Sequence, residues 1–276
     1  MAQLRRSEKL NIEAVRTEGF YFDGGTPEKP KHDYYYDGKL MSGVTTVLGV
    51  LAKPALIQWA ANQATEYIRE HVEYAIPGQD GGFWAVKPQT VEEARTAHAK
   101  FRDKRASEGT DLHGLVEEYV KYCIEANDGK PYIEGVKEEI VPFVQWAIKE
   151  NIRFLASEEK VYSKELWVAG TFDLLFEKDG KLIMGDLKNK KKLYGRDAMF
   201  QMAAYSIMWE EMHQPTYPLS KVFDDTILPI ECSEKKIDDY CVIRLWEDEL
   251  EAVWSGDTHG DREGFMACLK LYRLIK

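Results

Sequence analysis

The chain has 276 residues and a formal net charge of −10 at pH 7; 44% of its residues are hydrophobic and 30% are charged. This length and composition predict one core-forming domain with embellishments, or two small domains. No stretch approaches the roughly eighteen apolar residues of a transmembrane helix, and the N-terminus lacks a secretion signal, so we expect a cytoplasmic protein without a membrane partner.

The first 135 residues predict a mostly helical part. Residues 1–43 are irregular, with strand-like fragments around 34–36 and 39–41. Helical periodicity begins after Pro54 and continues to about Tyr74, and a segment rich in Pro and Gly, 76–86, predicts a loop.

A capping box at Thr90 opens a second predicted helix, which continues to Arg105. Gly109 interrupts it, and a further helix carries His113 on one side. Residues 137–151 are amphipathic again, and Pro142 implies either a helix start near that position or a kink.

From residue 154 the hydrophobic period changes to that of strands. Strands are predicted at 154–162, 168–177 and 182–188, and the turn 177–181 makes the last two a hairpin. A helix over 195–212, strands over 222–230 and 240–246, and a helix from 247 to the C-terminus follow. We interpret 1–276 as one domain, with a helical part (1–135), a catalytic core (136–246) and a C-terminal helix (247–276).

Two acids and a lysine stand on neighbouring predicted strands. Asp173 lies within an apolar run, and Asp186-Leu187-Lys188 ends the following strand, so Asp186 and Lys188 point to one side. Three other Asp-x-Lys matches, at 37–39, 128–130 and 179–181, have Gly in the middle and predict turns.

Buried charges cost several kcal/mol unless they are paired or hold a metal. Two carboxylates and a lysine are the groups that phosphodiester cleavage requires, because the carboxylates bind Mg²⁺ and the cation stabilises the phosphate. We therefore predict a catalytic site at Asp173, Asp186 and Lys188.

A basic cluster follows directly after this tripeptide. Beyond Lys188 itself, the cluster contains Lys190, Lys191, Lys192 and Arg196. A charge run by itself is more often a solvated loop, but its place beside two acids favours a surface that contacts phosphates.

The widely spaced cysteines argue against a structural zinc site. Cys123, Cys232, Cys241 and Cys268 form no Cys-x-x-Cys pair. We expect reduced, mostly buried thiols.

Four further features accompany the acids: His113, which follows Gly109 by four residues; Glu158; Gly170-Thr171 before Asp173; and Gln201 with Tyr205, one helical turn apart. Simpler interpretations remain open. His113 could pair with Glu117 along a helix, Gln201 and Tyr205 could serve helix packing, and Glu159 is an alternative to Glu158.

Together these motifs resemble the RecB-like branch of the PD-(D/E)XK nuclease superfamily, which includes phage exonucleases and the mitochondrial genome-maintenance exonuclease. The match covers roughly residues 105–210. The resemblance implies an α/β (α+β) fold with a restriction-endonuclease-like core, in which a central mixed sheet is flanked by helices, preceded here by a helical N-terminal half.

The resemblance also implies roles for these residues. Asp173, Asp186, the Leu187 carbonyl and His113 would ligate one or two Mg²⁺ or Mn²⁺ ions. Lys188 would orient the attacking water, and Glu158 would act through a second metal or a bound water. Gln201 and Tyr205 would position the site or contact the strand being degraded. Some relatives carry an iron–sulfur cluster, but the cysteine intervals here predict none.

The implied function is a metal-dependent DNA exonuclease that acts on ends or single strands in replication, recombination or repair. A phage origin would place it in the host cytoplasm, and a recombinase, helicase or single-strand-binding protein is a conceivable partner. Two alternatives stay open: a structure-specific or nicking endonuclease, and an inactive nucleic-acid-binding protein on a nuclease fold. The tyrosines 34–36 and several tryptophans are candidates for stacking on bases.

Overall fold

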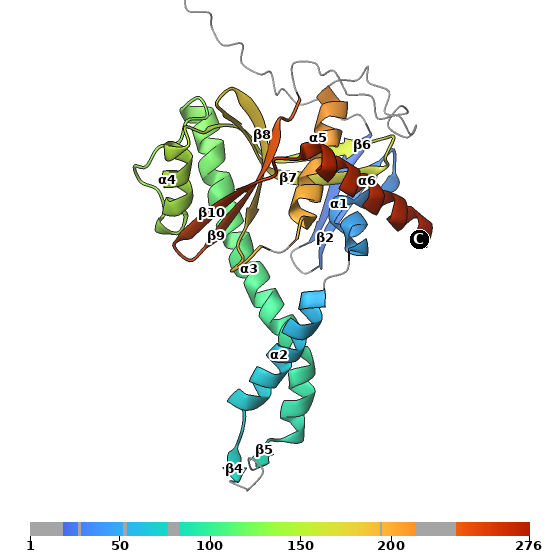
Figure 1. Ribbon diagram of the computed structural model, residues 1–276, viewed down its shortest axis with the longest axis vertical. Coiled ribbons are helices and arrows are strands. Elements are labelled where there is room, and N and C mark those ends of the chain that lie inside the picture. Colours follow the sequence, from blue (N-terminus) through green and yellow to red (C-terminus); the bar gives the residue numbers. More distant parts are fainter. Residues whose placement is uncertain (1–18, 27–28, 52–53, 77–82, 194, 214–235) are drawn as a thin grey trace, which may run out of the picture.

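A mixed sheet of eight strands forms the centre of the protein, as a computed structural model shows (Figure 1). The structure describes residues 19–26, 29–51, 54–76, 83–193, 195–213 and 236–276. The strands follow the order β1-β2-β3-β7-β8-β9-β10, and β6 pairs with β7. Their bounds are β1 (Phe20–Thr26), β2 (Lys29–Tyr36), β3 (Lys39–Gly43), β6 (Arg153–Ser163), β7 (Val168–Lys178), β8 (Lys181–Lys188), β9 (Asp239–Trp246) and β10 (Glu249–Trp254).

Strand β7 lies at the middle of this sheet. It pairs with β6 and with β8 in antiparallel fashion, and its first residues also pair with β3 in parallel. Strand β8 in turn pairs with β9 in parallel. Since both faces of β7 are covered, its side chains are apolar on both sides, and Phe172, Leu174, Leu175 and Phe176 are buried.

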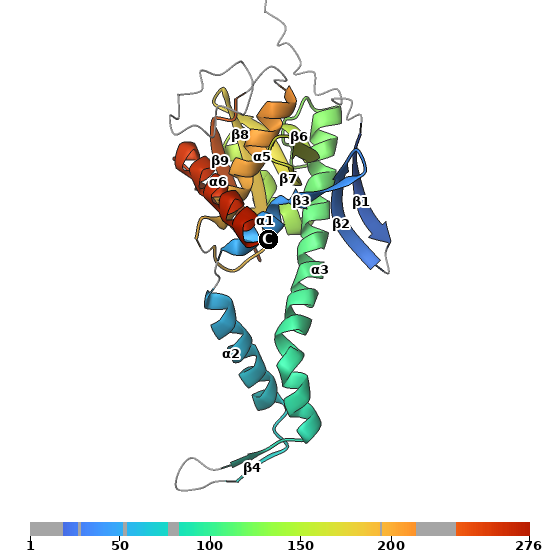
Figure 2. The same cartoon turned by 90° about the vertical axis from the view of Figure 1, so that its right-hand side faces the viewer.

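Helices cover both faces of the sheet (Figures 1 and 2). One core contains Leu175 and Met184 with the buried residues of α5 and α6, and the other contains Leu174 and Phe176 with those of α3 and α4. The helices are α1 (Val44–Val47), α2 (Pro54–Glu70), α3 (Pro88–Ala126), α4 (Val141–Lys149), α5 (Asp197–His213) and α6 (Thr258–Ile275), with short 3-10 helices at Leu48–Val50 and Glu138–Ile140.

A two-helix arm projects from this body. Helix α2 and the first half of α3 run side by side away from the sheet, and the small hairpin of β4 (Tyr74–Ile76) and β5 (Phe83–Ala85) forms the tip of the arm (Figures 1 and 2). The Trp59 ring on α2 lies edge-on to the rings of His98 and Phe101 on α3. Helix α3 then continues from the arm along the sheet.

The predicted arrangement of a central mixed sheet flanked by helices is confirmed. The helical N-terminal half is corrected. Five of the elements before residue 127 are strands, among them the β1–β3 meander where an irregular segment was expected and β4 and β5 where a loop was expected. Residues 20–22 and 34–36 are aromatic and pair with one another, which suits neighbouring strands and explains the difference.

Two other boundaries also differ from the prediction. Helix α3 passes through Gly109 without a break, because one glycine costs a helix only about 1 kcal/mol. The predicted helix from 247 is wrong at its start, since β10 precedes α6, which begins at Thr258. The predicted strand over 222–230 lies outside the described residues.

No helix among the described residues is long and apolar enough to cross a membrane. Cys123, Cys241 and Cys268 are buried free thiols. Cys232 lies outside the described part of the chain.

Candidate functional site

Three acids lie abreast on three neighbouring strands. On β6, Ser157 pairs with Leu174 and Glu159 with Phe172, which leaves Glu158 opposite Asp173. On β8, Gly185 pairs with Leu174, so that Asp186 continues the register opposite Asp173 on its other side. Residues opposite each other in antiparallel strands lie close together, so the strand pairing itself gathers the acids.

Asp173 stands at the centre of the group. Its Oδ2 atom accepts a hydrogen bond of 2.8 Å from the backbone N–H of Leu187. The Nδ1 atom of His113, on α3, lies 3.7 Å from the same oxygen. His113, Glu158 and Asp173 each offer one ligand atom, and these three atoms lie within 4.8 Å of one another. The predicted residues on α3, β6 and β7 are therefore brought together.

Asp186 and Lys188 form the other half of the site. The Lys188 ammonium donates a hydrogen bond of 2.7 Å to Asp186 Oδ1. Asp186 is 2% exposed, and its Oδ2 also lies 2.7 Å from the Lys188 ammonium in an ion pair. Burial lowers the pKa of Lys188, but Asp186 and Asp173 outweigh this effect and raise the pKa overall, so the lysine stays charged.

The surroundings of these acids disfavour their charged forms. Burial raises the pKa of both Asp173 and Asp186. Burial, and next the charges of Asp173 and Glu117, raise the pKa of Glu158 to about 7. Burial and the Lys188 charge lower the pKa of His113, so its imidazole is neutral at pH 7 and keeps a lone pair. Gathered carboxylates next to a neutral imidazole are a set of ligands that a cation would stabilise.

Glu158 has an unusual backbone for a strand. Its φ of +54° lies in the left-handed region, which costs a residue with a side chain about 1–2 kcal/mol. The neighbouring Ser157 hydroxyl donates a hydrogen bond of 3.1 Å to the Asp173 carbonyl and ties the two strands together here. Glu159 is exposed, whereas Glu158 faces His113 and Asp173. Such strain is concentrated at functional sites.

Gln201 and Tyr205 lie beside the acids on α5. The Gln201 Nε2 atom donates a hydrogen bond of 2.9 Å to the Tyr205 hydroxyl. The Tyr205 ring packs on Gly170 of β7, where a Cβ atom would have no room. Burial, together with the charges of Asp173 and Asp186, raises the pKa of Tyr205 well above its usual value.

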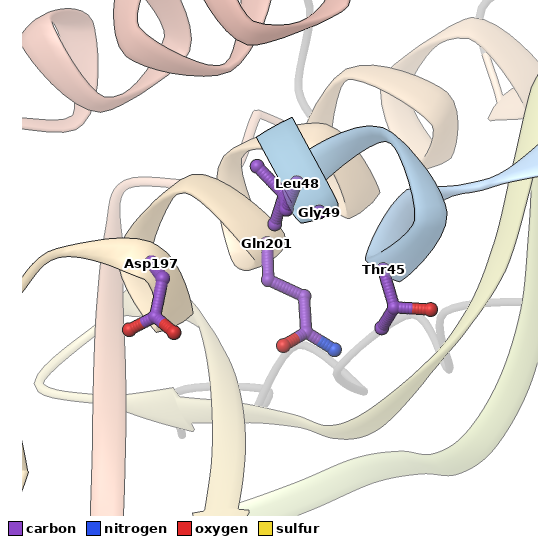
Figure 3. A pocket seen from close by; sticks show the side chains of 5 residues that line it. All are labelled: Thr45, Leu48, Gly49, Asp197 and Gln201. Carbon is purple, nitrogen blue, oxygen red and sulfur yellow. The ribbon is translucent and has the colours of Figure 1, made fainter. Parts of the chain in front are cut away.

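A small pocket of about 90 Å³ opens next to Gln201. Thr45, Leu48 and Gly49 line it from α1 and the 3-10 helix, and Asp197 and Gln201 line it from the start of α5. The polar ends of Asp197 and Gln201 point to the same side (Figure 3). Asp197, which lines this pocket, also raises the pKa of Lys188 through its charge.

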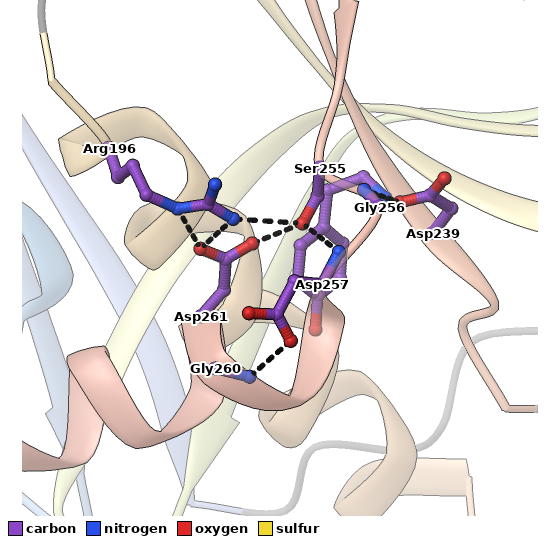
Figure 4. A network of polar contacts seen from close by, with 8 residues as sticks. Arg196, Asp239, Ser255, Gly256, Asp257, Gly260 and Asp261 are labelled. Carbon is purple, nitrogen blue, oxygen red and sulfur yellow. Dashed lines mark hydrogen bonds and ion pairs between the residues drawn. The ribbon is translucent and has the colours of Figure 1, made fainter.

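The basic cluster divides into two parts. Lys190, Lys191 and Lys192 are exposed after the end of β8. Arg196 donates hydrogen bonds to Asp261 Oδ1 at 2.9 Å and to Ser255 Oγ at 3.3 Å, and so links α5 to the β10–α6 junction (Figure 4). Asp261 is fully buried, which gives Arg196 a structural role. Nucleic-acid binding by these residues stays a prediction.

The three Asp-Gly-Lys segments are turns, as expected. Asp37, Asp128 and Asp179 have φ values of 45°, 52° and 52°, and the glycine after each also has a positive φ. None of these three acids belongs to the ligand group around Asp173. Their left-handed backbone explains why glycine follows.

One contact at the site was not predicted. The Tyr34 hydroxyl lies 3.0 Å from Thr171 Oγ1 and 2.7 Å from His32 Nε2. Thr171 and Tyr34 are 137 positions apart in the chain, so no local pattern indicates that they meet. The only signal was the row of aromatic residues at 34–36.

Comparison with known proteins gives little. No family model matches this chain, and no curated protein matches it. A solved structure titled "Crystal structure of SSO0001" is similar over 58% of this chain and 74% of its own length, with 11% sequence identity and a TM-score of 0.24.

Proposed function

We propose that this protein is a metal-dependent deoxyribonuclease of the RecB-like PD-(D/E)XK type that removes nucleotides from DNA ends or single strands. The observation that carries the proposal is the row Glu158, Asp173 and Asp186 on three adjacent strands, with Lys188 paired to the last. A structural role would not account for this row, because buried acids side by side cost stability.

The residues present fit Mg²⁺ or Mn²⁺. Ligand atoms of His113, Glu158 and Asp173 lie within 4.8 Å of one another, and the buried Asp186 carboxylate, paired with Lys188, continues the row of acids. Carboxylate oxygens suit both ions, and one neutral imidazole favours Mn²⁺. Asp173, Asp186, Glu158 and His113 would hold the metal, together with the Leu187 carbonyl. The bound metal would supply an activated water and a counter-charge for the phosphate.

The protein's own groups prepare the site for phosphodiester hydrolysis. Lys188 is held in its charged form beside Asp186, so it can stabilise negative charge that develops on the phosphate. The Leu187 N–H fixes one Asp173 oxygen and leaves the other to ligate. Water attacks the phosphorus in line as the bond from phosphorus to the 3′-oxygen breaks. One proton of the water ends on the departing 3′-oxygen, the other stays on the new phosphate oxygen or passes to solvent, and the product carries a 5′-phosphate.

Digestion of labelled linear DNA with Mg²⁺ or Mn²⁺ tests the proposal. Asp186→Ala removes one acid of the row and should lower the rate by at least about 100-fold, the scale of losing a main electrostatic group. Asp179→Ala is the matched control, because Asp179 precedes Gly-Lys in an exposed turn. Equal rates for Asp186→Ala and wild type would refute the proposal.

Circular single-stranded DNA separates the two kinds of nuclease. An exonuclease leaves a circle intact, whereas a nicking or structure-specific endonuclease opens it. Substrates labelled at the 5′ or the 3′ end then give the direction of degradation.

A further inference from the structure

The β1–β2 hairpin has two faces of different chemistry. Phe22 pairs directly with Tyr34, and Tyr21 pairs with Tyr35. Because neighbouring residues of a strand point to opposite faces, Phe22 and Tyr34 lie on one face and Tyr21 and Tyr35 on the other. The face with Tyr34 turns towards the sheet, since Tyr34 is buried against Tyr162 and Ala169.

This inner face reaches the acids through hydrogen bonds. The Tyr34 hydroxyl lies 3.0 Å from Thr171 Oγ1, and Thr171 is two residues before Asp173 on β7. Residues two apart on a strand point to the same side. The hairpin is therefore attached beside the row of acids at Asp173.

Phe22 and His32 form a rim at the edge of this inner face, and Lys160 adds a cation to their aromatic rings. His32 is exposed, its ring lies edge-on to that of Phe22 at 4.9 Å between centroids, and its Nε2 lies 2.7 Å from the Tyr34 hydroxyl. Lys160, two residues after Glu158 on β6, places its ammonium 5.3 Å from the centre of the partly exposed Phe22 ring. Aromatic rings beside a lysine are the usual components of a surface that binds single strands.

On the outer face the rings stack on each other and the lysine is paired with an acid. There the Tyr21 and Tyr35 rings stack on each other at 4.8 Å. The Lys31 ammonium forms an ion pair of 3.0 Å with Asp23, which lies opposite another acid, Asp33. Asp23 neutralises the Lys31 charge and Asp33 adds a negative one, which disfavours a phosphate next to Lys31.

We propose that Phe22, His32 and Lys160 bind the single-stranded DNA that leads into the row of acids. One base stacks on the rim formed by Phe22 and His32, and Lys160 contacts a phosphate of the same strand. This inference rests on the function proposed above and names the surface that holds its substrate.

Binding of fluorescein-labelled dT20 in EDTA, followed by anisotropy, tests the surface without cleavage. Phe22→Leu keeps an apolar side chain but removes the ring, and should weaken binding by about 5- to 20-fold, the range for one lost base stack. Tyr21→Leu is the matched control on the adjacent position of the same strand. A thermal melt of each variant verifies that the hairpin remains folded.

An abasic strand of the same length separates stacking from charge. Wild type should bind dT20 more tightly than the abasic strand, and Phe22→Leu should lose this preference. Lys160→Gln should weaken binding to both strands, because it removes a phosphate contact.

The outcomes distinguish this inference from the proposed function. If Phe22→Leu binds dT20 as tightly as Tyr21→Leu while wild type still digests DNA, the inference is wrong and the nuclease proposal stands. If wild type neither binds dT20 nor digests DNA with either metal, both are wrong.

Discussion

Gly170 should not tolerate even a methyl group. A Cβ atom at this position would fall well inside van der Waals distance of Tyr205 Cε1 and lie 3.2 Å and 3.3 Å from Cζ and Cδ1. The ring cannot move aside freely, since Tyr205 is 4% exposed and its hydroxyl accepts a hydrogen bond from Gln201. Overpacking of this kind costs about 1–3 kcal/mol, so Gly170→Ala should lower Tm by about 2–10 °C.

Gly114 provides the control. It lies on α3 next to His113, and a Cβ atom there meets nothing within 4 Å. Gly114→Ala should therefore stabilise the chain by about 0.5–1 kcal/mol through helix propensity. Thermal and urea unfolding of Gly170→Ala and Gly114→Ala measure the change in stability that each variant causes.

A double-mutant cycle identifies the cause. In a Tyr205→Ala background the ring is gone, so Gly170→Ala should cost less than about 0.5 kcal/mol. If Gly170→Ala is as stable as wild type, or costs the same with and without the ring, the close approach of Tyr205 is not the reason for glycine here.

Three further predictions concern charged groups. Arg196→Ala leaves the buried Asp261 with one partner fewer and should cost about 1–3 kcal/mol in urea unfolding; a loss no larger than that of the exposed Lys192→Ala would contradict this role. The pKa of Glu158 rises from 4.5 in the unfolded chain to about 7 when folded, so its contribution to stability is full below about pH 4.5 and is lost as the pH rises to 7. Because the Glu158 side chain is partly exposed, the free energy of unfolding of wild type in EDTA should fall by about 1–2 kcal/mol between pH 5 and 8. The fall should be smaller for Glu158→Gln, and an equal fall in both proteins would contradict the raised pKa of Glu158. Mn²⁺ at a hundred times its Kd should stabilise wild type by about 2.7 kcal/mol, with a clearly smaller rise in Tm for His113→Ala; equal rises would exclude His113 as a ligand.

Much of the site could be predicted from the sequence because its acids lie on consecutive strands. A short turn joins β7 to β8, so the spacing of Asp173 and Asp186 fixes their register. The same reasoning identified three Asp-Gly-Lys turns, since glycine after aspartate favours a left-handed backbone.

What escaped prediction depended on distant contacts or on weak local signals. Tyr34 meets Thr171 only because β3 joins the edge of β7, which no local pattern specifies. The strand β10 did have a signal, the alternation of Leu250, Ala252 and Trp254, but the acids among them suited a helix start equally well. Helix α3 continues through Gly109 because one glycine costs a helix only about 1 kcal/mol.

The left-handed backbone of Glu158 lowers the stability of the fold at a residue that the proposed function requires. Glycine at this position would remove a conformational cost of about 1–2 kcal/mol and also the repulsion between Glu158 and Asp173. A chain optimised for thermostability alone would therefore discard Glu158, and Glu158→Gly should melt at a higher temperature than wild type while digesting DNA more slowly. Under the proposed function, Glu158 costs the fold stability and supplies an acid of the metal site.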